Sequence, residues 1–274
     1  GSSTGLLSHP ILGLSCGPAP SGLGLPVATR YVAPAAGLAV IPKGHNAALI
    51  ESDGAVRRSP AAVCVEGNAF PALSLSAFLQ LGGYDSWYGE LRSGSGLLDP
   101  EASLTLAGYP GLEIPLDSTG AMRISFAKAP SAFRAVSAGD VLNSRVDPAL
   151  LENAWVIVGG TAFGMADIVP TPYSGSAFGV ELQARLLASI LDVDMPFSPR
   201  GAPWILSLIS LVFASALYAL AASGGRIAAF GLPVAAVLFP VVAAAIHIWT
   251  LASWSLWLGW FAPALYGLLA ASGL

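Results

Sequence analysis

The C-terminal segment from Ala202 to Leu274 contains a single charged side chain, Arg226, whereas the residues before Gly201 hold all sixteen acidic residues and eleven of the twelve basic ones. About 20 consecutive apolar residues in a helix span a hydrocarbon core of about 30 Å. The sequence therefore predicts a water-facing domain of residues 1–195, a linker of residues 196–201 and a membrane segment of residues 202–274.

The membrane segment divides into three predicted transmembrane helices, at about residues 202–222, 227–249 and 254–274. The second contains Pro233 and Pro240, which a membrane helix tolerates with a kink. The predicted links, Ser223 to Gly225 and Thr250 to Ser253, are so short that neighbouring helices must run antiparallel.

Two features orient this segment in a bilayer. Four tryptophans fall at the ends that share one side of a three-helix zigzag, as in an interfacial aromatic belt: Trp204, Trp249, Trp254 and Trp257. Arg226 falls on the opposite side, where the positive-inside rule places the cytoplasm. We therefore expect residues 1–201 to lie outside the inner membrane and the C-terminus to lie in the cytoplasm.

The charge and the spacing of polar residues along the chain exclude some classes of function. The chain carries a net charge of −4 and has no basic run, so a nucleic acid is not an expected partner. His9, His45 and His247 are widely spaced and have no companion cysteine, so no metal site is predicted. Neither a Ser/His/Asp arrangement nor a paired-carboxylate motif is present, so no catalytic residue is assigned.

The only cysteines are Cys16 and Cys64. Outside the cytoplasm they can form a disulfide. Each also lies in an apolar, strand-like setting where buried free thiols are common. Both interpretations stay open at the level of sequence.

Local patterns in the water-facing part predict a mixed α/β domain around one sheet. Ala47–Glu51 and Val56–Val65 flank an Asp-Gly turn, which is a strong hairpin signal. Leu112–Leu116 and Met122–Phe126 flank a similar turn and predict a second hairpin. Residues 70–81 have helical apolar spacing, with Pro71 in the first turn.

The residues that precede the linker carry the most specific pattern. Trp155–Val158 predicts a short strand, and a glycine-rich bend and an irregular loop follow it. A helix is predicted from Gly179, with an apolar stripe made of Val180, Ala184, Leu187 and Leu191. Glu181 and Arg185 stand four residues apart in that helix and can form an ion pair.

Five residues are candidate ligand-binding positions. Thr161 lies in the bend that begins Gly159-Gly160; its spacing does not match a phosphate-binding loop, so a structural turn is favoured there. Asp167 can bind a ligand or ion, although loop aspartates more often cap backbone amides. Glu181 lies at a helix start, where the dipole alone favours a carboxylate.

The other two candidates are Arg57 and Arg58, which can read an anionic ligand through charge-assisted hydrogen bonds. Strand alternation predicts that they point to opposite faces, so at most one serves any given site. The alternative is one solvated and one paired arginine.

Several segments, taken in order, resemble a known family. They are Ser52–Pro60, Phe70–Leu75, Ile114–Asp117 with Gly120, Ser137–Leu142, Val156–Ala162 with Asp167 and Thr171-Pro172, and Gly179-Val180-Glu181. Together they resemble the CHASE domain of the second type, an extracellular sensory domain associated with bacterial cyclases and histidine kinases. The resemblance covers roughly residues 6–195 and is to the later two-thirds of such a domain, followed by its usual three membrane helices. The family usually has a histidine two positions after the motif's glutamate, where this chain has Gln183.

The resemblance implies a non-enzymatic input and membrane-relay chain of the bacterial inner membrane, with residues 1–201 in the periplasm and without a cofactor. Its effector is expected to be a cytoplasmic cyclase, kinase or diguanylate cyclase module outside these residues. The expected partners are the lipid bilayer, a second copy in a homodimer, and a small ligand or protein on the extracytoplasmic side. The alternative is a membrane-anchored accessory or assembly subunit of a larger complex, and a periplasmic enzyme is the least favoured class.

Overall fold

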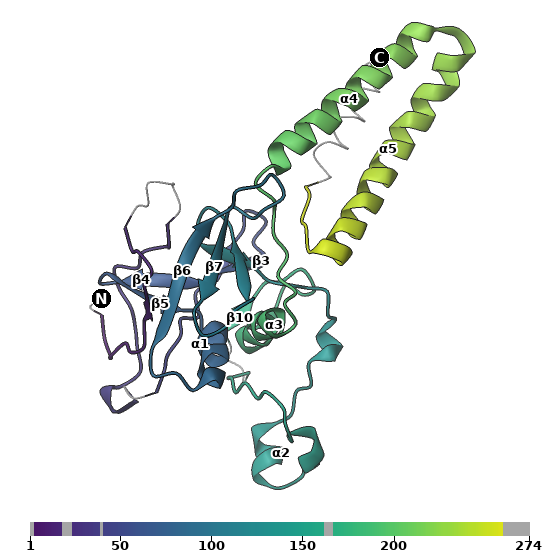
Figure 1. Cartoon of the computed structure of the whole chain (residues 1–274). Helices are drawn as coiled ribbons and strands as arrows, with labels where there is room; N and C mark the ends of the chain where they lie inside the picture. The colour runs from purple at the N-terminus through teal and green to yellow at the C-terminus, as the bar shows by residue number, and fades with distance from the viewer. Residues whose placement is uncertain (1–2, 18–23, 39–40, 162–166, 260–274) are drawn as a thin grey trace. The chain divides into compact units, whose positions relative to one another are not determined.

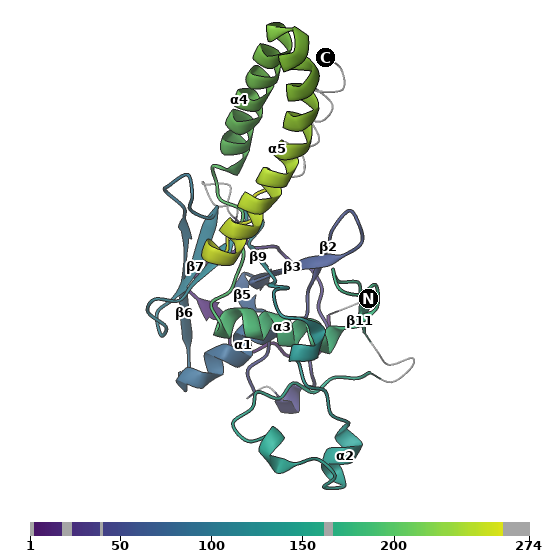
Figure 2. The same cartoon turned by 90° about the vertical axis from the view of Figure 1, so that its right-hand side faces the viewer.

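The computed structural model describes residues 3–17, 24–38, 41–161 and 167–259 (Figures 1 and 2). The chain divides into two compact units. The first comprises residues 1–90, 104–114 and 118–195, and the second comprises residues 91–103, 115–117 and 196–274. The mixed α/β class predicted from the sequence is confirmed.

The largest sheet has six strands in the order β4-β5-β1-β6-β7-β8. These strands are β4 (Ala62–Val65), β5 (Asn68–Pro71), β1 (Ile11–Leu12), β6 (Trp87–Ser93), β7 (Ala102–Leu106) and β8 (Glu113–Leu116). β4 and β5 form a hairpin whose two turn residues, Glu66 and Gly67, have φ angles of 50° and 81°. Positive φ at both positions is typical of the tight hairpin turn that matches strand twist.

A separate sheet has three antiparallel strands, β2 (Leu49–Ile50), β3 (Val56–Pro60) and β9 (Ala121–Arg123). The hairpin predicted around the Asp-Gly turn is confirmed as β2–β3. The predicted strand Val56–Val65 divides at Ala61, and its halves join different sheets. The prediction of one sheet is therefore wrong for the described residues.

The second predicted hairpin, over residues 112–126, is also wrong. Its two arms are β8 and β9, but β8 pairs in the six-stranded sheet whereas β9 pairs with β3. The backbone of Ala61 donates to the carbonyl of Gly120 at 3.1 Å, so the turn is held by a distant segment. Non-local pairing has overridden a favourable local turn.

Two helices pack together in the first unit, α1 (Leu73–Leu79) and α3 (Gly179–Leu191). They lie side by side in Figures 1 and 2. Residues 70–71, predicted as helical, instead end β5, and a 3-10 turn (Gln80–Gly82) extends α1. Shorter elements are α2 (Ala138–Leu142) and the 3-10 turns Ala36–Leu38, Pro130–Ala132 and Pro148–Leu150.

The helix predicted from Gly179 is confirmed, but its buried face differs from the predicted stripe. Of the four predicted residues only Leu187 is buried. The buried positions are Leu182, Gln183, Arg185, Leu186, Leu187, Ser189 and Ile190. This broad face contacts α1 and also the loops around it, so it includes polar residues that an apolar stripe omits.

The strand predicted at Trp155–Val158 does not form. The segment has no ladder partner among the described residues, and Val158 is 85% exposed. It ends an arm, residues 127–160, in which no residue is buried. An apolar run alone cannot separate a sheet strand from an unpaired extended segment, because pairing depends on what the rest of the fold places beside it.

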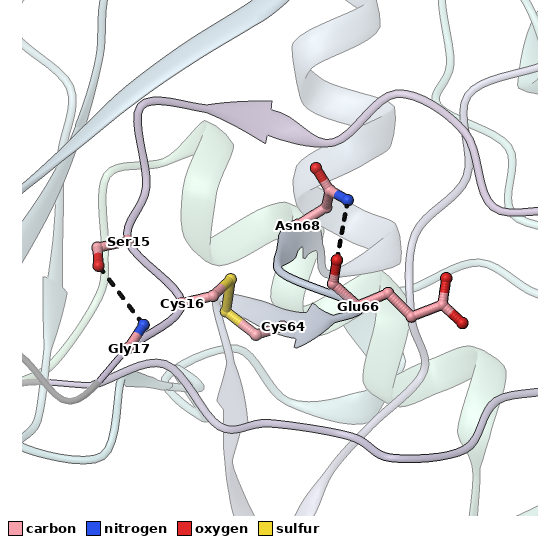
Figure 3. The surroundings of a disulfide bond; sticks show 6 residues. All are labelled: Ser15, Cys16, Gly17, Cys64, Glu66 and Asn68. Carbon is pink, nitrogen blue, oxygen red and sulfur yellow. Dashed lines mark hydrogen bonds between the residues drawn. A yellow bond between two sulfur atoms is a disulfide. The ribbon is translucent and has the colours of Figure 1, made fainter.

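Cys16 and Cys64 form a disulfide with a Cα–Cα distance of 5.6 Å (Figure 3). This resolves the two alternatives left open above. The backbone of Cys64 also exchanges hydrogen bonds with Pro26 and Ala28, at 2.8 Å each, so the outer edge of β4 is covered. A disulfide is typical of an oxidising compartment outside the cytoplasm.

The second unit contains two long helices, α4 (Ala202–Ser223) and α5 (Gly225–Trp254). Both are long and apolar enough to cross a membrane, with mean hydropathies of 2.2 and 2.3. They lie side by side in both views, with the rings of Phe213 and Phe239 stacked 3.7 Å apart.

The boundaries of these helices correct the predicted topology in part. α5 includes Pro233 and Pro240 as expected, but it also includes Thr250–Ser253, which were predicted as a link. The third predicted helix falls largely on residues 260–274, outside the described residues, and residues 255–259 are not helical. The structure therefore describes two candidate membrane helices.

Candidate functional site

The start of α3 is built around Asp167. β10 (Ile168–Val169) and β11 (Ala177–Phe178) form an antiparallel ribbon that leads directly into α3. The backbone N–H of Gly179 donates to the carbonyl of Asp167 at 2.7 Å. A Cβ at position 179 would lie 2.8 Å from Oδ2 of Asp167, so glycine leaves room for the carboxylate. A negative charge at this end of a helix is favourable.

A cavity of about 370 Å³ lies beside this helix start. Its wall is formed by the strand region before β3, the extended segment 157–160, β10 and the first turn of α3. Asn46, Ala48 and Ile50 all line it, as expected for alternate residues on one face of an extended chain. Its polar side chains are Asn46, Asp167 and Gln183.

Of the five candidate residues, Asp167 is the one that lines this cavity. Thr161 is exposed and follows the lining residue Gly160. The Glu181 carboxylate is directed to Arg185. Arg57 and Arg58 lie on β3, outside the lining. A ligand-binding role for each of the five stays a prediction.

Gln183 belongs to this region although sequence reasoning did not select it as a candidate. Its side chain is 6% exposed, and its Oε1 accepts a hydrogen bond of 2.7 Å from Ser74 of α1. The same hydroxyl lies 2.9 Å from the Gln183 carbonyl. A polar residue between Leu182 and Leu186 on a buried face is the signal that could have found it.

Arg185 is the largest buried side chain of α3, with 1% exposure. Its Nε and Nη2 donate to Glu181 Oε1 at 3.0 and 2.9 Å, which confirms the predicted pair. Its Nη1 donates to the carbonyl of Lys128 at 2.8 Å. The guanidinium also lies 5.0–5.2 Å from three ring centres, those of Phe126, Phe133 and Tyr173. Arg185 thus ties α3 to the base of the arm.

Arg57 and Arg58 share an acidic partner. Glu51 accepts from Arg57 Nη1 at 3.1 Å and from Arg58 Nε at 3.0 Å. Arg57 also binds the carboxylate of Asp53, at 2.7 Å. This hydrogen bond, with help from the backbone of Ala55, lowers the pKa of Asp53 to about 2. The alternative of one solvated and one paired arginine is therefore wrong, since both pair with Glu51 across the β2–β3 turn.

His45 directly precedes Asn46, the first of the cavity-lining residues. Its backbone N–H donates to Pro71 and its carbonyl accepts from Leu73, both at 2.9 Å, so it joins the end of β5 to the start of α1. Burial lowers the pKa of His45 from 6.5 to about 4. The ring is therefore neutral near neutral pH, with Nδ1 accepting from the backbone of Ala47.

The linker before α4 is itself a hydrogen-bonded element of the second unit. The backbone N–H groups of Arg200 and Gly201 donate to the carbonyls of Asp99 and Leu97, at 2.8 and 2.7 Å. Asp99 and Leu97 belong to the connection between β6 and β7. Two backbone N–H groups, of Gly96 and Ser95, donate to the Asp99 carboxylate and hold the pKa of Asp99 below its usual value.

The other side of the linker pairs with the residues just after α5. Phe197 donates to the carbonyl of Ser255 at 2.9 Å and accepts from the N–H of Trp257 at 2.7 Å. The linker is thus a short extended segment held on both edges, and α4 begins one residue after the last of these bonds.

No group of three or more His, Cys, Asp or Glu side chains within the described ranges could hold a metal ion. The family model of the CHASE2 domain matches residues 25–221, which is more than half of the 274 residues. Comparisons with curated proteins and with solved structures found no match. CHASE2 is an extracellular sensory domain of signalling receptors and not a catalytic domain. The resemblance predicted from the sequence is confirmed, and this chain belongs to the CHASE2 domain family.

Proposed function

We propose that this chain is the input and membrane-relay part of a bacterial transmembrane receptor. In this proposal residues 1–201 face the periplasm, α4 and α5 cross the inner membrane, and a third helix returns the chain to the cytoplasm. The extracytoplasmic state then reaches a cytoplasmic cyclase, kinase or diguanylate cyclase module through α4. Because such outputs usually work as pairs, the receptor acts as a homodimer.

The relay proposal rests on the hydrogen bonds that the linker makes. The linker leaves α3 and enters α4, and along the way it is hydrogen-bonded to the β6–β7 connection by Arg200 and Gly201. β6 and β7 are themselves strands of the six-stranded sheet. A displacement of either α3 or this connection therefore acts on the residue that begins α4. A stimulus shifts such an equilibrium only by its difference in affinity for the two states.

The test is a series of one to four alanines inserted between Gly201 and Ala202. Each inserted helical residue rotates the remainder of α4 by about 100° relative to the linker. Output, read from a cyclase module fused after Leu274, should therefore change strongly for one to three residues and recover in part for four, since four residues complete about one turn. The same insertions after Ser118, an exposed turn position, are the control. An output that ignores every insertion before Ala202 refutes the relay.

A second candidate function is an accessory or assembly subunit, and the arm favours it. Residues 127–160 contain no buried residue, and large apolar side chains are among the exposed ones: Leu142 is 84% exposed and Trp155 is 45% exposed. Exposed apolar side chains gathered on one segment often mark protein contacts. Photo-crosslinking from position 142 distinguishes the candidates: an assembly subunit yields a stable product with a different protein, whereas a receptor input domain that relays through α4 does not need one.

A further inference from the structure

The cavity beside α3 has a polar composition that selects among ligands. Among the described lining residues, Asp167 is the one with an ionisable side chain. The carboxylate lies against Gly179, and Asp167 is exposed. An anionic ligand would be repelled there, whereas a protonated amine would gain a partner.

The helix start does not reverse this preference. The first turn of a helix carries a partial positive charge, which by itself attracts anions. Here the Asp167 carboxylate already occupies that position, over the first residue of α3. The net field at this end of the cavity therefore favours a cation.

Gln183 supplies a second recognition group. Its side chain is 6% exposed and its Oε1 is occupied by the Ser74 hydroxyl. Its amide nitrogen carries two N–H donors, and Gln183 lines the cavity. A ligand that offers an acceptor oxygen can therefore take a hydrogen bond from this amide.

The spacing of the two polar groups and the volume of the cavity limit the size of a ligand. Gln183 lies one turn beyond Gly179, about 6 Å along the helix axis. Between these polar ends the cavity presents apolar side chains that include Ile50, Val56 and Val180. A volume of about 370 Å³ lies at the low end of the range for small-molecule sites.

We propose that this cavity binds a small primary amine that also carries a carbonyl or hydroxyl acceptor and a short apolar body. The ammonium group pairs with Asp167, the acceptor takes the Gln183 amide, and the body contacts the apolar wall. The two polar contacts lie at the start of α3 and one turn further along it, so occupancy acts on the helix that leads to the linker. As a signal input this site rests on the proposed function; as a binding site it does not.

The test is calorimetric titration of the full chain in lipid nanodiscs with three probes that share the leucine side chain. Leucinamide has the ammonium group, the carbonyl and an apolar side chain. N-acetyl-leucinamide lacks the positive charge, and leucine has a carboxylate in place of the carboxamide. We expect saturable binding of leucinamide, with at least ten-fold weaker binding of the other two.

Variants locate the binding. Asp167→Asn should weaken leucinamide at least ten-fold, whereas Asp85→Asn, a matched change at an exposed carboxylate outside the lining, should not. Ala48→Phe fills the cavity from its wall and should abolish binding while circular dichroism still shows a folded domain. No leucinamide binding up to about 10 mM, equal binding of either other probe, or equal binding to Asp167→Asn overturns the proposal. None of these measurements uses signalling output, so their failure leaves the relay to be judged by the linker insertions alone.

Discussion

Replacement of Arg185 by alanine is expected to destabilise the first unit by about 3–5 kcal/mol, the usual cost of removing one partner of a buried ion pair. Arg185 is 1% exposed, whereas its partner Glu181 is 27% exposed. The carboxylate left behind can therefore be hydrated, which places the expected cost toward the lower end of this range.

The individual contacts support that magnitude. The charge-assisted hydrogen bonds to Glu181 and the bond to the Lys128 carbonyl contribute about 1.5–3 kcal/mol together. The three aromatic rings at 5.0–5.2 Å contribute about 0.5–1 kcal/mol each. Arg185→Lys keeps the charge but loses the planar fork and should cost about half as much.

The assay is urea unfolding of the full chain in nanodiscs, monitored by near-ultraviolet circular dichroism. Arg145→Ala is the matched control, because Arg145 also pairs with an acidic residue, at 2.7 Å, but is 65% exposed. Exposed pairs contribute about 0.2–1 kcal/mol. Hydrogen exchange should increase around Phe126, Phe133 and Tyr173 in Arg185→Ala and not in the β4–β5 hairpin. If Arg185→Ala costs no more than Arg145→Ala, the assignment of Arg185 as the tie between α3 and the arm is refuted.

Three further predictions concern stability, each read from the same urea midpoints. Because burial lowers the pKa of His45 from 6.5 to about 4, the unfolded chain binds a proton that the folded chain does not between these values; stability should fall by up to about 3 kcal/mol as pH drops through this window, and His45→Asn should flatten that slope. Replacing both Cys16 and Cys64 by alanine removes a cross-link over a sequence separation of 48 residues and should cost about 4 kcal/mol in the chain-entropy account; an unchanged midpoint contradicts it. Gly44→Ala should be strongly destabilising because its Cβ would lie 2.3 Å from the backbone of the first residue of α1, whereas Gly175→Ala, with no atom within 4 Å, should be nearly neutral.

The features that sequence patterns predicted well are those determined within a few residues. The Asp-Gly hairpin, the start of α3 at Gly179 and the Glu181–Arg185 pair all depend on local turn chemistry or helical spacing. The apolar character of α4 and α5 likewise follows from composition over each helix.

The features that patterns missed depend on distant partners. Trp155–Val158 looks like a buried strand, but no described strand pairs with it. The arms of the second predicted hairpin found partners in two sheets. The cavity brings together Asn46, Asp167 and Gln183 from three segments, and no local spacing relates them. The aromatic rings around Arg185 likewise come from residues 12 to 59 positions away in the sequence.

In the proposed receptor the sensor domain faces outward and α4 carries its state inward. In this chain both native cysteines form the disulfide, so a single introduced cysteine provides a free thiol for labelling. Ser118→Cys lies in an exposed turn of the first unit, and Ser223→Cys ends α4. A charged maleimide that cannot cross the inner membrane should label Ser118→Cys in intact cells and label Ser223→Cys only after permeabilisation; labelling of Ser223→Cys in intact cells, or of Ser118→Cys only after permeabilisation, contradicts the account.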